Sequence, residues 1–276
     1  MFGNEIWPTA VTLAIVFSVT AALYSAAGFG GGSTYSAVLL GARVPAPIVP
    51  LVSLPCNIVV SGIGFVRALR REIVPVRLLF SILVMSVPAA FVGGIIPLSR
   101  ELFLTLLAIV LLYAGGASLV TGWRSEFGPR RRNVHGAELQ LNLSGAGEGR
   151  RRIVVAGALI GFVSGLVGIG GGIMLSPILQ REQILRPRHV SALSAGFILF
   201  NSVAALSGKV IAAAGSELHG TTARLTELAA PTALLAGVVF TGGLIGSSIA
   251  IRGLTAGRLR LITGVLLVSV SLRVLV

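Results

Sequence analysis

The sequence predicts an all-helical integral membrane protein made of two copies of one unit, inverted relative to each other. Three observations lead to this prediction. Of the 276 residues, 54% are hydrophobic and 11% are charged, and the mean hydropathy is +0.94. Long apolar runs follow one another along the chain, and a glycine-rich motif occurs once in each half. This composition excludes an ordinary soluble domain.

Eight apolar runs are candidates for spanning helices, because a helix needs about 20 apolar residues to cross a bilayer. They lie at roughly 11–27, 48–66, 73–96, 102–120, 153–167, 190–214, 228–251 and 261–276. Two shorter apolar pieces, 33–40 and 173–179, cannot span the membrane alone. Each follows a glycine-rich motif, which indicates a broken or re-entrant helix at both places.

The glycine-rich motif reads Gly-Phe-Gly-Gly-Gly at 28–32 and Gly-Ile-Gly-Gly-Gly at 168–172, which is 140 positions later. Glycine inside a helix destabilises it by about 1 kcal/mol relative to alanine. A repeated break at membrane depth is typical of transporters whose helices are interrupted at the substrate site. The alternative is that these glycines only let helices pack closely in the membrane.

The two halves match beyond the glycines. Residues 57–64 align with 201–208 at an offset of 144, and residues 91–94 align with 240–243 at an offset of 149. The segment between the copies is polar and rich in arginine and glycine, so it is expected to form an exposed loop. The predicted organisation is a first membrane repeat, a cytoplasmic linker and a second membrane repeat, at 1–122, 123–152 and 153–276.

The distribution of basic residues predicts the orientation. If the chain continued through the membrane at each glycine motif, Lys and Arg would divide 14 to 8 between the two sides. If the chain instead turns back there as a re-entrant hairpin, they divide 17 to 5. The positive-inside rule favours the second arrangement. Each repeat then holds one glycine-rich hairpin and three spanning helices, the repeats are inverted, and both termini lie outside.

The start of each short helix is a candidate anion site. Backbone N–H groups are free at a helix start, and with the positive end of the helix dipole they attract anions. Irregular backbone at membrane depth is tolerated only where protein buries it or where it lines a cavity. The predicted substrate-binding residues are glycines of both motifs and the hydroxyl residues after the first motif: Gly30, Gly31, Gly32, Ser33, Thr34, Gly170, Gly171 and Gly172.

Polar residues within the apolar spans form a second set of candidates. Ser53, Asn57 and Ser61 are four residues apart and therefore share one helix face. Ser194 and Asn201 have a similar place in the second copy. Because polar groups in the membrane need partners, Ser53, Asn57, Ser194 and Asn201 are added to the predicted substrate site. The alternative for all of them is a hydrogen bond that only holds two helices together.

Other residue types exclude several function classes. The chain has no aspartate, one lysine (Lys209) and one cysteine (Cys56), so no metal site, cofactor or intrachain disulfide is expected. It lacks a phosphate-binding Gly-x-x-x-x-Gly-Lys-Ser/Thr motif, and no buried acid or nucleophile–base pair is visible within the spans. An enzyme is therefore not expected. Lys209 aligns with Phe65 of the first copy and is assigned no role.

The chain resembles the sulfite exporter TauE/SafE family of bacterial membrane proteins. The resemblance rests on the two glycine motifs, Pro177 downstream of the second, residues 190–194 leading to Asn201, and the Gly-Gly pairs at 93–94 and 242–243. It covers nearly the whole chain. It implies transport of small sulfur-containing anions, such as sulfite or organosulfonates like sulfoacetate, across the bacterial inner membrane.

These observations together predict a secondary transporter, in the exporting direction, for small sulfur-containing anions held between the two glycine-rich helix starts at the repeat interface. An anion channel that uses the same site, and a transporter of another small anion, are the alternatives. The expected partners are the anionic substrate and the lipid bilayer, and homo-oligomer formation is left open. The net charge of +13 arises from basic loops between spans, so no nucleic-acid partner is expected.

Overall fold

The computed structural model describes residues 6–27, 29–127, 147–181, 185, 187–215, 221–249 and 256–275. Over these residues the chain is all-helical, as predicted, and forms no strand. The helices are α1 (Ile6–Ala27), α2 (Gly32–Gly41), α3 (Val49–Arg70), α4 (Val76–Ile95), α5 (Arg100–Phe127), α6 (Gly147–Val167), α7 (Gly172–Arg181), α8 (Pro187–Gly215), α9 (Thr221–Ile249) and α10 (Ala256–Leu275). Each predicted apolar run coincides with one of the longer helices, and the two short pieces form α2 and α7.

Five stretches of these helices are long and apolar enough to cross a membrane: Val49–Arg70, Val76–Ile95, Arg100–Phe127, Arg188–Ala214 and Leu228–Ser248. Shorter apolar helical stretches cover Val11–Ser25 and Leu261–Leu272. Large apolar side chains are exposed on the outside of the bundle, for example Val11, Ile15 and Val19 along one side of α1. An exposed apolar stripe of this kind suits contact with lipid. The chain is therefore a multi-pass membrane protein.

The chain reverses direction at the first glycine motif, so that α2 runs back beside α1. The rings of Phe17 and Tyr35 stack with their centroids 4.5 Å apart. The hydroxyl groups of Tyr24 and Thr34 share a hydrogen bond of 2.8 Å across the turn. Gly28, the first residue of the motif, lies outside the described residues.

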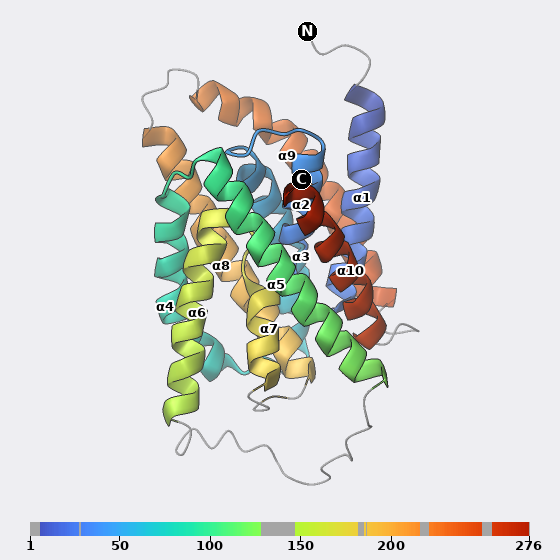
Figure 1. Ribbon diagram of the computed structural model, residues 1–276, viewed down its shortest axis with the longest axis vertical. Helices are drawn as coiled ribbons and strands as arrows, with labels where there is room; N and C mark the ends of the chain where they lie inside the picture. Colours follow the sequence, from blue (N-terminus) through green and yellow to red (C-terminus); the bar gives the residue numbers. More distant parts are fainter. Residues whose placement is uncertain are drawn as a thin grey trace.

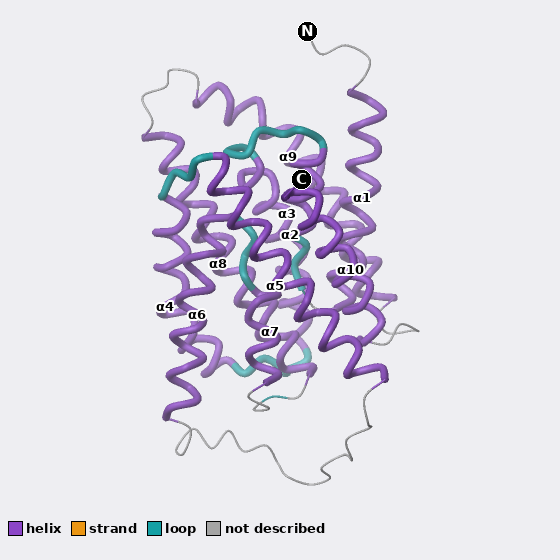
Figure 2. Tube along the Cα trace, viewed as in Figure 1, coloured by secondary structure: helices purple, strands orange, loops and turns teal. Residues whose placement is uncertain are grey.

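A similar reversal joins α6 to α7 at the second motif (Figure 1). The backbone N–H groups of Gly168 and Ile169 both donate to the carbonyl of Ser164, at 2.7 and 3.1 Å. Gly171 packs against Ile160 and Ser164 of α6. Figure 2 shows the connections from α1 to α2 and from α6 to α7 as short loop stretches inside the helix bundle.

The repeated Gly-Gly pairs let helices from opposite halves of the chain pack closely. On α4, Gly93 contacts the backbone of α6 at Phe162, and Gly94 contacts the backbone of α8 at Ala205. On α9, Gly242 contacts the backbone of α1, and the carbonyl of Gly243 accepts a hydrogen bond from Ser25 of α1 at 2.9 Å. Accordingly α4 packs on α6 and α8, while α9 packs on α1 and α3. Small residues allow this close approach in membranes.

The helix ends lie at two opposite ends of the bundle. The start of α1 and the end of α10 lie toward one end of the molecule, and the end of α5 and the start of α6 lie toward the other (Figure 1). Helices α5 and α6 extend into both margins of the predicted linker, to Phe127 and from Gly147. The rest of that linker, 128–146, lies outside the described residues.

Candidate functional site

Asn57 lies between the two glycine-rich turns and is bonded to both. Its Oδ1 accepts a hydrogen bond from the N–H of Gly32 at 3.0 Å. Its Nδ2 donates to the carbonyl of Ile169 at 3.1 Å and to the hydroxyl of Ser202 at 2.9 Å. One fully buried amide therefore ties α3 to the start of α2, to the second turn and to α8.

The counterpart of Asn57 in the second half, Asn201, makes fewer hydrogen bonds. Its Nδ2 donates to the carbonyl of Phe197 in its own helix at 2.9 Å. Its Oδ1 is buried and has no hydrogen-bond partner among the described atoms. The two asparagines occupy matching positions, but only Asn57 bridges the turns.

The hydroxyl residues at the start of α2 are buried and only partly bonded. Thr34 is held by Tyr24, and Ser36 donates to Ser53 at 3.1 Å. Ser53 donates in turn to the carbonyl of Gly168 at 3.4 Å. This chain of hydroxyls links the first short helix to the second turn. The Oγ of Ser33, near the Tyr24 hydroxyl, has no hydrogen-bond partner within the described part of the chain.

Several buried polar atoms near the turns thus have no hydrogen-bond partner among the residues that the structure describes. They are Ser33 Oγ, Tyr35 OH, Ser194 Oγ and Asn201 Oδ1, in residues that are at most 1% exposed. A buried polar group without a partner destabilises a fold by about 1–3 kcal/mol. Ser194 belongs to α8, and its backbone carbonyl faces Gly172 at the start of α7. Ser33 belongs to the start of α2, so each of the two serines lies next to one short helix start.

The glycines of the two motifs fall into two groups according to their neighbours. Gly30, Gly32 and Gly170 face the side chain of Asn57, and any side chain on them would collide with its amide. Gly172 faces Ile198 of α8. These four glycines therefore allow the turns to approach α3 and α8.

We call the place where the two glycine-rich turns meet Asn57 the junction. Gly31 and Gly171 face away from it. Gly31 packs against the ring of Tyr35, and Gly171 packs against Ile160 and Ser164. Their contacts therefore belong to their own hairpins. The structure brings Gly30, Gly32, Ser53, Asn57 and Gly170 together, and it does not bring Gly31 or Gly171 into the same contact.

The electrostatic character of the junction comes from backbone and neutral side chains. In α2 the first helical hydrogen bond runs from Tyr35 N to Gly31 O, so the N–H groups of Gly32, Ser33 and Thr34 have no carbonyl within the helix to bond. Asn57 takes the N–H of Gly32. No group of His, Cys, Asp and Glu side chains that could hold a metal ion is found among the described residues.

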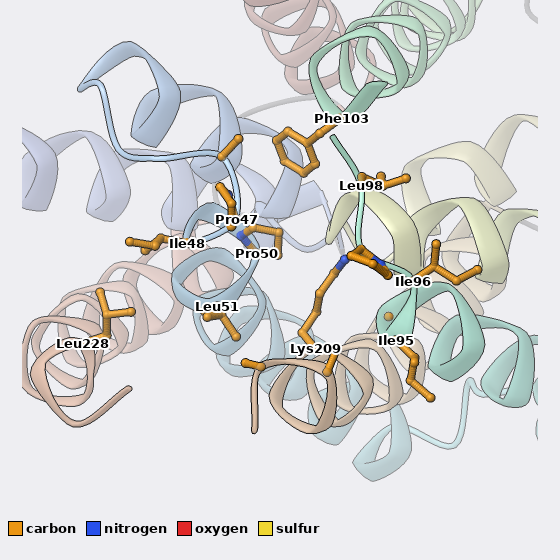
Figure 3. A pocket seen from close by; sticks show the side chains of 15 residues that line it. Pro47, Ile48, Pro50, Leu51, Ile95, Ile96, Leu98, Phe103, Lys209 and Leu228 are labelled. Atoms are coloured by element: carbon orange, nitrogen blue, oxygen red, sulfur yellow. The ribbon is translucent and has the colours of Figure 1, made fainter. Parts of the chain in front are cut away.

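Sequence reasoning missed one residue that the structure places in a cavity. Lys209 of α8 lines a cavity of about 320 Å³ together with the α2–α3 connection, the α4–α5 connection, the end of α8 and the first part of α9. Figure 3 shows its side chain extending from α8 toward Ile96. The signal in the sequence was that the single lysine falls inside an apolar span, where ionisable residues usually have a function.

Comparison with known proteins identifies the family. The sequence profile of the family described as "Sulfite exporter TauE/SafE" matches residues 13–274. A relative from Sinorhizobium fredii, described as "Probable membrane transporter protein y4hK", is 31% identical over 271 residues, which cover 96% of this chain and 98% of the relative. No solved structure matches the chain significantly. Both descriptions are of transport proteins, in agreement with the expectation that the chain is not an enzyme. The chain belongs to the TauE/SafE sulfite exporter family of membrane transporters.

Proposed function

We propose that this chain is a secondary transporter that exports small sulfur-containing anions, such as sulfite or an organosulfonate, across the bacterial inner membrane. The family description names a sulfite exporter, which supports this substrate class. The observation that carries the proposal for the site is the meeting of two short helices at their starts, on either side of Asn57. Helix starts attract anions through free N–H groups and the positive end of the dipole.

The unpartnered atoms at this junction support a polar ligand. The hydroxyl groups of Ser33 and Ser194 can donate hydrogen bonds to an oxyanion, and Asn201 has a second Nδ2 hydrogen to donate. Its Oδ1 can accept a hydrogen bond from a protonated oxygen, which bisulfite carries. The proposed site consists of the glycines Gly30, Gly31, Gly32, Gly170, Gly171 and Gly172 with Ser33, Thr34, Ser53, Asn57, Ser194 and Asn201.

Within this site some residues hold the protein together and others remain available to contact the anion. Asn57 has all of its donors and one acceptor position in use, so it positions the two turns relative to each other. Thr34 and Ser53 are also engaged with protein partners. The side chains left to contact the anion are those of Ser33, Ser194 and Asn201, in addition to the free N–H groups at the helix starts.

The proposed architecture is a pair of inverted repeats, 1–122 and 153–276, with the linker 123–152 in the cytoplasm and both termini outside. The packing supports it, because exchanging each helix of the first half for its counterpart in the second half reproduces the partners: α4 on α6 and α8 becomes α9 on α1 and α3. Transporters built in this way hold the substrate where the repeats meet.

Cysteine labelling tests the orientation. Ser125→Cys, at the exposed cytoplasmic end of α5, should react only with reagent inside the cell, and a reporter fused to the C-terminus should be active only outside. Ser99→Cys, at the other end of α5, is the matched control and should react from outside. A C-terminus on the same side as Ser125 would contradict the inverted arrangement.

Transport in proteoliposomes tests the function. Labelled sulfite should enter by saturable counterflow, and a singly charged organosulfonate such as methanesulfonate should compete better than sulfate if a sulfonate or sulfite group is recognised. The site variant is Ser33→Ala with Ser194→Ala, which removes two hydroxyls that have no described protein partner and should weaken uptake while the protein remains folded. Flux that is linear with concentration would instead identify an anion channel, and no flux of any of these anions would refute the substrate class.

A further inference from the structure

The cavity next to Lys209 lies at the end of the molecule where α2 joins α3 and α4 joins α5 (Figures 1 and 3). In the proposed orientation this is the outer side. Its volume of about 320 Å³ falls within the range of small-molecule sites, which is about 300–1,000 Å³. Its walls are apolar, mainly proline, leucine and isoleucine side chains, and among the residues that the structure describes Lys209 is the one ionisable residue that lines it.

The cavity adjoins the second glycine-rich turn. Pro50 lines it and also lies in contact with Gly168, whose carbonyl accepts the hydrogen bond from Ser53. On α8, Lys209 stands seven residues after Ser202, which is nearly two helical turns, so both residues face the same side of the helix about 10 Å apart along its axis. Ser202 is the hydroxyl that Asn57 contacts. The cavity and the junction of the turns are therefore neighbours along one face of α8.

The charge of Lys209 is not neutralised by the surrounding protein that the structure describes. Among the described side chains Lys209 forms no ion pair, and its side chain is half-buried. A single cation in apolar walls attracts one negative charge. A doubly charged anion would leave half of its charge uncompensated in a poorly hydrated space, which is strongly unfavourable.

We propose that this cavity is an anion vestibule in which Lys209 binds a singly charged anion next to the second glycine-rich turn. That the anion passes on to the turns rests on the proposed transport function; binding at Lys209 does not. The competing explanation is structural. Lys209 reaches the end of α4, where a cation stabilises the negative end of the helix dipole, and such a role needs no ligand.

Thiol labelling in the cavity separates the two explanations without measuring transport. Ala212 lines the cavity one turn beyond Lys209 and is the reporter position. Ala212→Cys is labelled with a sulfonate-bearing methanethiosulfonate and with its trimethylammonium counterpart, and the ratio of the two rates is taken. The native Cys56 is fully buried, so the parent protein supplies the background rate.

In the protein with Lys209, the rate ratio should favour the anionic reagent. In Lys209→Gln the ratio should fall about tenfold, because a charge in a cleft raises the local concentration of counter-ions about tenfold. Lys209→Arg should preserve the ratio. Arg100→Gln is the matched control, since Arg100 is exposed at the same end of the molecule and does not line the cavity. Methanesulfonate should protect the reporter cysteine in the Lys209 protein and not in Lys209→Gln.

The vestibule proposal would be overturned by an unchanged rate ratio in folded Lys209→Gln. It would also be overturned if methanesulfonate protected the reporter cysteine equally with Lys209 and with Lys209→Gln. In either case Lys209 would only stabilise the end of α4. If Lys209→Gln does not fold, Lys209→Arg and methanesulfonate protection of Ala212→Cys in the protein that keeps Lys209 decide the question, and absence of protection there overturns the inference. Anion-dependent protection without sulfite transport in proteoliposomes would refute the proposed function and leave the vestibule intact.

Discussion

The two glycine-rich turns share their spacing but are held in different ways. In the first, Gly31 precedes α2 with φ of −95°, a conformation open to any residue. Hydrogen bonds from side chains secure this turn, from Tyr24 to Thr34 and from Asn57 to Gly32. In the described part of the first motif, glycine is required because neighbouring side chains leave no room for a Cβ atom, and not because of the backbone conformation.

The second turn is secured by its backbone. Gly168, Gly170 and Gly171 have φ of +79°, +79° and +71°, in the left-handed region that favours glycine. The residues that follow, Ile173 and Met174, carry no hydroxyl groups, in contrast to Ser33 and Thr34 at the same places in α2. The duplicated motif therefore reverses the chain in both halves with different backbone conformations, and the polar chemistry is concentrated in the first copy.

The largest expected effect is that of Gly170→Ala. The new Cβ would be strained at positive φ and would meet Asn57 and Ser202, so unfolding should become easier by about 2–5 kcal/mol. Thermal unfolding in detergent measures it. Gly237→Ala, in open space on α9, is the control and should be neutral or slightly stabilising. Equal stability of the two variants would contradict the strained second turn.

A smaller effect is expected from the paired asparagines, and it separates their roles. Asn57→Ala leaves the N–H of Gly32 and the carbonyl of Ile169 without their partner, and should destabilise the protein by about 1–3 kcal/mol. Asn201→Ala removes one hydrogen bond within a helix and should cost about 1 kcal/mol or less. In Asn201→Ala the loss of free energy of anion binding should exceed the loss of free energy of unfolding. Equal loss of stability in both variants would show that Asn201 also holds the turns together.

Ser33→Ala tests ligand contact at the polar first turn. Its hydroxyl has no described partner, so the melting temperature should not fall. Anion affinity should fall by about 0.5–1.5 kcal/mol, a factor of roughly 2 to 12, if the hydroxyl donates to the substrate. Isothermal titration on the purified variant measures this affinity. Thr34→Val is the contrasting change, because it breaks the hydrogen bond to Tyr24 and should reduce stability. Unchanged affinity in Ser33→Ala would remove Ser33 from the site.

The smallest effect is expected from Arg43→Gln, which changes an exposed charge in the connection after α2. Initial uptake should slow by about threefold or less at low salt, and the difference should shrink as salt rises, because steering over distance is screened. Rates measured over a salt series show this. A complete loss that does not depend on salt would mean that a cation, and not the turn, binds the substrate.

The sequence by itself determined the helical membrane class, the positions of the long helices and the two breaks. These properties depend on local composition, because the preference of a segment for the bilayer and the tendency of glycine to interrupt a helix act over a few neighbouring residues. Helices α5 and α6 continue beyond their apolar runs, to Phe127 and from Gly147. A helix can extend past the membrane because its backbone hydrogen bonds are satisfied within it.

Only the tertiary structure decided which polar residues meet. Asn57 reaches Ser202, which is 145 positions away, and Ile169, which is 112 positions away, because α3 and α8 cross beside the turns. It also decided that Gly31 and Gly171 face their own hairpins, and that Lys209 enters a cavity formed where separate segments converge. Helical periodicity indicates which residues share a face, but the partner of that face depends on how whole helices pack. Hydrogen bonds between distant segments therefore become visible only in the folded protein.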